Sequence, residues 1–188
     1  MRYPPIPQAD MTEEQRRVFD AIAGRSARGV SGPFVSLMHV PKINDHLERL
    51  ILEMRFGTII PEDLRVLAIM TVARNWKCQV EFYVHKRLAR EAGLPDEVVE
   101  ALAKGERPGG MSPDREMIYD FAQELCDTGR VGDGNFGRVA ERFGKQLALE
   151  LTTVCASFAM LAMVLNVAET PLPPGAIPPF EGDRRTAS

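Results

Sequence analysis

The chain has 188 residues, of which 45% are hydrophobic and 26% are charged, and its formal net charge is −3. This length and composition are typical of one soluble globular domain that buries a sizeable apolar core. The charge balance and a pI near 5.7 give no electrostatic reason to expect nucleic acid or an anionic membrane as a partner.

The cysteines and the first residues indicate a compartment. Cys78, Cys126 and Cys155 are too few, too dispersed and too odd in number for a disulfide framework. Residues 1–7 contain three prolines and lack the apolar run of a signal peptide. We therefore expect a protein of the reducing cytoplasm.

Helix signals follow one another through the first half of the chain. Thr12 offers an N-cap with Gln15 at the third helical position, which is the spacing of a capping box. After a break at residues 29–33, Pro41 opens a helix that Gly57 closes. Pro61 opens the next helix, which is apolar on most of its sides.

Five further helices are predicted in the second half. They are expected at about residues 77–92, 95–104, 135–143 and 147–168, and from residue 113 to just beyond residue 125. No stretch alternates in the manner of a β-strand, and the sequence contains no internal repeat. The sequence therefore predicts an all-α fold of about eight helices in one domain.

The segment 147–168 is nearly all apolar or small and is about long enough to cross a bilayer. Thr152, Thr153 and Ser157 make it only mildly hydrophobic, and no second span accompanies it. A helix that is apolar all round is also typical of a central or subunit-interface position. We favour a buried helix of a soluble protein and expect no membrane partner.

Proline-rich segments flank a core that we place at about 11–170 of the single domain 1–188. Residues 1–10 and 171–188 contain clustered prolines, which predict extended arms rather than helices. Such arms often lie across a neighbouring subunit, and the alternative is a frayed tail.

One group of side chains can carry chemistry. If the segment around residues 73–85 is helical, Cys78, Glu81 and His85 fall within an arc of about 60° on one face. A thiol, a carboxylate and an imidazole are the groups of proton-transfer or thiol chemistry. A buried cysteine is most often a small hydrophobe, but a position in the first helical turn would lower the pKa of Cys78.

The neighbours of Glu81 and His85 favour a functional pair over a solvated surface pair. Phe82 and Leu88 place part of this helix against the core, and Trp76 could form an apolar wall. In such surroundings Glu81 would hold His85 in one tautomer and raise its basicity.

Two arginines are candidate substrate-binding residues. Arg55 and Arg74 end mostly apolar helices, where each could balance an acidic substrate group or satisfy helix carbonyls. His39 and His46 do not have the spacing of a ligand pair, so we expect no metal. We also expect no cofactor.

With these residues, the chain resembles the carboxymuconolactone decarboxylase and AhpD-like family. The resemblance covers roughly residues 30–170 and includes a Gly-Pro-Phe segment at 32–34, Glu81-x3-His85 and Gly93-Leu94. It implies an all-α fold, assembly into a homo-oligomer (a trimer or a hexamer) and a pocket for a small-molecule substrate near a subunit interface.

The two branches of that family differ in their chemistry. The peroxidase branch uses a C-x-x-C pair, a histidine and an upstream glutamate, but here Glu81 and Val66 stand in two of those four positions. The resemblance to the decarboxylase-like branch is better. It implies a lyase or isomerase that acts on a small carboxylated ring or lactone through His85 and Glu81. The alternatives are a thiol-dependent peroxidase or reductase using Cys78, and a non-catalytic member.

Overall fold

The computed structural model describes residues 1–26 and 29–181, and within them it is all-helical, as the sequence predicts. The described residues form a short 3₁₀ turn and nine α-helices and contain no strand. The elements are η1 (Gln8–Asp10), α1 (Glu13–Arg25), α2 (Pro33–Leu37), α3 (Pro41–Phe56), α4 (Glu62–Asn75), α5 (Gln79–Glu91), α6 (Asp96–Lys104), α7 (Pro113–Thr128), α8 (Asp133–Phe143) and α9 (Lys145–Ala168).

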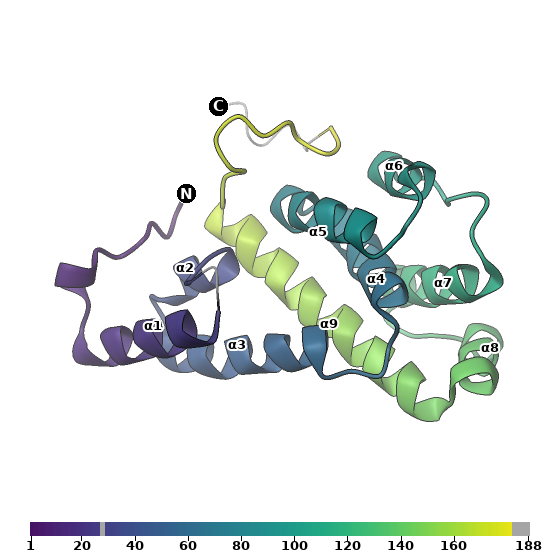
Figure 1. Cartoon of the computed structure of the whole chain (residues 1–188), viewed down its shortest axis with the longest axis horizontal. Coiled ribbons are helices and arrows are strands. Elements are labelled where there is room, and N and C mark those ends of the chain that lie inside the picture. Colours follow the sequence, from purple (N-terminus) through teal and green to yellow (C-terminus); the bar gives the residue numbers. More distant parts are fainter. Residues whose placement is uncertain (27–28, 182–188) are drawn as a thin grey trace.

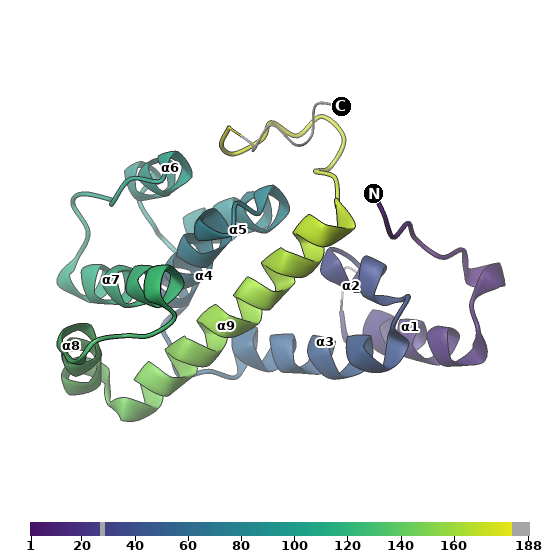
Figure 2. The same cartoon turned by 180° about the vertical axis from the view of Figure 1, so that it is seen from behind.

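Helix α9 runs diagonally across the molecule and separates two groups of helices (Figures 1 and 2). On one side α1, α2 and α3 lie together, and on the other α4 to α7 do. Helix α4 packs against α5, α7 and α9, so it is the central element of the second group. All but five of its residues are buried, which explains why its sequence is apolar on most sides.

Local sequence signals set most of the helix ends. Thr12 and Gln15 form the predicted reciprocal capping box at the start of α1. Pro41 is the first residue of α3, and Gly57 follows its last residue. Gly105 and Gly129 adopt the left-handed conformation after α6 and α7, where a side chain would be strained.

The structure departs from the predicted elements at two places. The predicted break at 29–33 is followed by the five-residue helix α2, which is too short to leave a periodic signal in the sequence. The helix that carries Glu81 and His85 begins at Gln79 rather than at Lys77. Lys77 has a φ of 51°, so the backbone turns sharply there and Cys78 becomes the N-cap of α5.

Both proline-rich arms contact their own chain. The backbone N–H of Arg2 donates to the carbonyl of Ala168 at the end of α9, and its side chain forms an ion pair with Glu169. In the other arm, Phe180 is buried edge-on against Phe82 of α5, with ring centroids 5.4 Å apart. The first arm also includes η1, so it is not wholly extended; residues 182–188 lie outside the described part of the chain.

By length and composition α9 could cross a membrane, and half of its most apolar 18-residue stretch is buried inside the protein. Its inner side supplies the core, where Leu151, Val154, Phe158 and Leu161 are at most 2% exposed. This is the behaviour of the central helix of a soluble globular fold.

Candidate functional site

The candidate site is the first part of α5, and the turn before that helix positions it. The sharp turn at Lys77 ends α4 and starts α5, so that the two helices pack against each other. The residues that face inward from α5 include Glu81, Phe82 and His85, all buried. The sequence predicts this shared face, and the structure brings Glu81 and His85 into contact.

His85 is held by Glu81 through one nitrogen. Its Nδ1 lies 3.2 Å from the Oε1 atom of Glu81 and 3.0 Å from the backbone oxygen of the same residue. Because a backbone oxygen can only accept, this geometry places a proton on Nδ1. His85 is 4% exposed and Glu81 6%, which is unusual for an ion-pairing couple one helical turn apart.

An aromatic ring from another helix fixes the other side of His85. The imidazole meets the ring of Phe158 in α9 edge to face, with centroids 5.4 Å apart and an angle of 89° between the planes. Sequence reasoning missed this residue, because α5 and α9 are far apart in the chain. Its one sequence signal is that it is the only aromatic residue of α9.

Burial and charge act against each other on Glu81. Burial raises the pKa of this carboxyl to about 7, and the positive charge of Arg55 in α3 lowers it in part. Arg55 was a predicted substrate-binding residue, and the structure brings its charge close enough to act on Glu81. The guanidinium also lies 5.0 Å from the ring centre of Phe56.

The expected activation of Cys78 is wrong. The thiol is fully buried beside Ala162 and Leu165 of α9. Burial raises its pKa to about 12, although hydrogen bonds from the backbone N–H groups of Glu81 and Val80 act in the opposite direction. The helix terminus does favour the thiolate, as the sequence suggests, but desolvation is the larger effect.

Arg74 and Trp76 lie outside the contacts described above for Glu81 and His85. The Nε of Arg74 donates to the carbonyl of Ala103 at 3.0 Å, and its guanidinium covers the ring of Phe180 at 4.7 Å. Trp76 follows the end of α4 and is 38% exposed, and its carbonyl accepts from the side chain of Asn166 at 2.8 Å. Neither has a described contact with Glu81 or His85.

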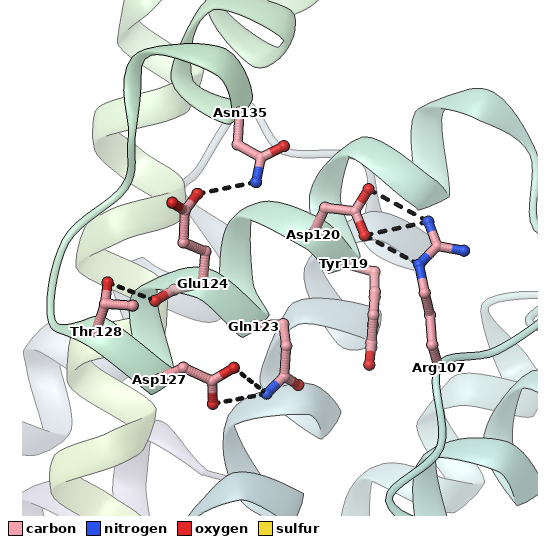
Figure 3. A pocket seen from close by; sticks show the side chains of 8 residues that line it. All are labelled: Arg107, Tyr119, Asp120, Gln123, Glu124, Asp127, Thr128 and Asn135. Atoms are coloured by element: carbon pink, nitrogen blue, oxygen red, sulfur yellow. Dashed lines mark hydrogen bonds and ion pairs between the residues drawn. The ribbon is translucent and has the colours of Figure 1, made fainter.

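Two cavities on the surface involve α7 rather than α5. The larger, of about 440 Å³, lies along α7 and is drawn in Figure 3. Its acidic side chains are already satisfied: Asp120 pairs with Arg107, and Glu124 accepts from Asn135 at 2.8 Å. The smaller, of about 280 Å³, is lined by Arg74 and the end of α6. No residue of α5 lines either cavity.

The described residues contain no group of three histidine, cysteine, aspartate or glutamate side chains placed to hold a metal ion. His39 instead approaches the carbonyl of Pro4 with its Nε2 at 3.0 Å.

No protein-family model matches the chain, and no curated protein matches it either. The resemblance to the carboxymuconolactone decarboxylase and AhpD-like family thus stays a prediction from the quoted residues.

Proposed function

We propose that the protein is a cytoplasmic acid/base enzyme, decarboxylase-like or isomerase-like, that acts on a small carboxylated ring or lactone. His85 is the proton carrier and Glu81 is its partner. The observation that carries the proposal is the buried contact between these two side chains next to the charge of Arg55. A carboxyl whose pKa lies near neutrality is suited to proton transfer at physiological pH.

The reaction can be written for a carboxylated lactone. The bond between the ring and its carboxylate breaks, CO₂ leaves, and the electron pair stays on the ring as a dienolate. Protonated His85 then delivers a proton to carbon through Nε2, since Nδ1 is held by Glu81. Ionised Glu81 stabilises the imidazolium before transfer, and water restores the proton afterwards.

Arg55 would serve both the enzyme and the substrate. Its charge already offsets the cost of ionising Glu81. A substrate carboxylate near the same guanidinium would be held by charge until CO₂ forms. Because Glu81 and His85 are more than nine-tenths buried, the reaction also requires a movement that opens a path to them.

The alternative thiol chemistry is disfavoured by the surroundings of Cys78. A thiol with a pKa of about 12 is almost wholly protonated at neutral pH, and the thiolate is the reactive form. Cys78 is better explained as a packing residue under the N-terminus of α5.

The test is turnover of unsaturated lactone carboxylic acids by the purified protein, followed as release of CO₂. We expect at least one member of such a panel to be turned over, and His85→Ala to lower the rate about 10²–10⁴-fold, the usual contribution of a general acid or base. His46→Ala is the matched control, because His46 is an exposed histidine of α3.

Two results would contradict the proposal. One is a His85→Ala variant that folds, by circular dichroism, and keeps full turnover of every accepted substrate. The other is a panel in which no lactone carboxylate is turned over while one binds at the site, which would favour the non-catalytic alternative.

A further inference from the structure

The outward side of α9 is an exposed row of uncharged side chains. All six of its members are exposed to solvent, and we call them the outer stripe. They are Leu149, Thr153, Ala156, Met160, Met163 and Val167. Leu149 is 67% exposed and Val167 56%, although both are large aliphatic residues. An exposed apolar row of this kind on a soluble protein usually marks a contact surface.

The spacing of the outer stripe is that of a coiled-coil seam. Its members follow one another at alternating steps of four and three residues, so they form a narrow line about 27 Å long on one helix face. The one hydroxyl in the line is already satisfied, since Thr153 donates to the carbonyl of Glu150 at 2.7 Å. Thr153 can therefore turn its methyl group outward.

We propose that the outer stripe binds the outer stripe of a second copy of this chain, with the two α9 helices antiparallel about a two-fold axis. The pairing does not rest on the proposed chemistry. It rests on the match between the side chains of the two stripes when the two α9 helices run antiparallel.

Antiparallel pairing matches large side chains with small ones. A two-fold axis at the middle of the stripe places Met160 opposite Ala156 of the second copy and Met163 opposite Thr153. Leu149 meets Val167 at the two ends. A parallel pair would place methionine on methionine and alanine on alanine, which leaves crowding in one layer and a void in the next.

Residues beside the stripe fit the same arrangement. The backbone N–H of Ile59 donates to Glu150 at 2.8 Å, so exposed Ile59 lies near the N-terminal half of α9. The carbonyl of Trp76 accepts from Asn166, so this exposed ring lies near the C-terminal half. In the antiparallel pair Glu150 faces Asn166 of the second copy, which brings Ile59 towards Trp76 across the contact.

The charges at the ends of α9 also agree. Lys145 at the start of the helix approaches Glu169 of the second copy, a carboxylate that already pairs with Arg2 of its own chain and can accept from a second cation. Antiparallel helices also place each positive helix end next to a negative one. A two-fold contact builds a dimer, or a hexamer made from three such pairs, and excludes an isolated trimer.

The first test measures the mass of the full chain by light scattering from low to high micromolar concentration. We expect a mass that is an even multiple of 20.9 kDa. Trp76 is the only tryptophan, so its emission reports the same event and should shift to the blue as the pair forms. Met160→Glu should give a folded monomer without that shift, whereas Ile177→Glu, which changes an 84% exposed residue outside the stripe, should leave the mass unchanged.

A charge exchange tests the direction of the helices. Thr153→Lys and Met163→Glu should each weaken the pair, and the double variant should restore it, because lysine then faces glutamate in both copies. In a parallel pair the double variant would oppose like charges and stay monomeric. The proposal is overturned by a wild-type monomer at high micromolar concentration or by an assembly that Met160→Glu does not affect. Failure of the double variant to recover, or a monomer that instead binds phosphatidylglycerol vesicles through the stripe, also overturns it.

Discussion

Burial acts on two acids at the start of α5 and leaves them in different states. The Cys78 thiol, with a pKa of about 12, stays protonated at neutral pH. The Glu81 carboxyl is equally enclosed, but the positive charge of Arg55 brings its pKa back to about 7. The difference follows mainly from the residue types, because burial raises the ordinary pKa values of 9.0 and 4.5 by similar amounts, and the guanidinium only limits the rise at Glu81.

The raised pKa of Glu81 makes the stability of the fold depend on pH. Between the ordinary value of 4.5 and the folded value of about 7, the folded state binds a proton that the unfolded state has lost. The stability associated with this carboxyl is thus complete below pH 4.5 and is lost as the pH rises through 7. Glu81→Gln removes the effect. From about pH 4 to pH 8 this carboxyl should cost the wild type about 3 kcal/mol of its free energy of unfolding, and Glu81→Gln should not show that loss.

Urea unfolding of both proteins at the two pH values measures that loss, with Glu53→Gln, an exposed change in α3, as the control. An equal pH dependence in the wild type and Glu81→Gln would show that Glu81 is ionised like an exposed carboxyl.

At the scale of elements, α1 is joined to α3 by a buried charge. The carboxyl of Glu48 is 3% exposed, and its Oε2 lies 2.7 Å from the Nη2 of Arg25 at the end of α1. The same Nη2 lies 3.0 Å from Asp45. Because a buried carboxylate without its partner is costly, Arg25→Ala should lower the free energy of unfolding by roughly 2–4 kcal/mol.

Arg49→Ala is the matched control for that change. Arg49 also pairs with Asp45, but its side chain is 60% exposed and the pair lies one helical turn apart on the surface. We expect it to cost less than about 0.5 kcal/mol in thermal or urea unfolding. Equal losses in the two variants would mean that the burial of Glu48 does not matter.

Most helix boundaries were predictable because short local signals specify them. The capping box at Thr12, the opening proline of α3 and the glycine after α6 act within a few residues of themselves. The turn at Lys77 was not predictable, since a left-handed lysine has no sequence signature. The folding of the C-terminal arm depends on the distant contact between Phe180 and Phe82.

The same distinction holds for the site. The contact between Glu81 and His85 follows from their spacing on one helix, so the sequence predicts it. The position of Arg55 near Glu81 and of Phe158 against His85 depends on how α3 and α9 pack, which periodicity does not reveal. The pKa of Cys78 was mispredicted because the sequence does not reveal how completely the sulfur is buried, and desolvation outweighs the effect of the helix terminus.

At the scale of the whole molecule, α9 links the site to the proposed assembly. Phe158 points inward to His85, about 200° around the helix from Ala156 and Met160 of the outer stripe. One helix therefore has an inner face that completes the site and an outer face that is left for a second copy. A substitution on the outer stripe can thus remove the assembly without touching the contacts of His85.

The most direct test of the central claim is the pH dependence of CO₂ release from an accepted lactone carboxylate, compared between the wild type and Glu81→Gln. If ionised Glu81 supports protonated His85, the wild-type rate should rise as the pH passes through about 7, and this inflection should be absent in the variant, at a lower rate throughout. An identical profile and rate in both proteins would contradict the assignment of Glu81 and His85 as the acid/base pair.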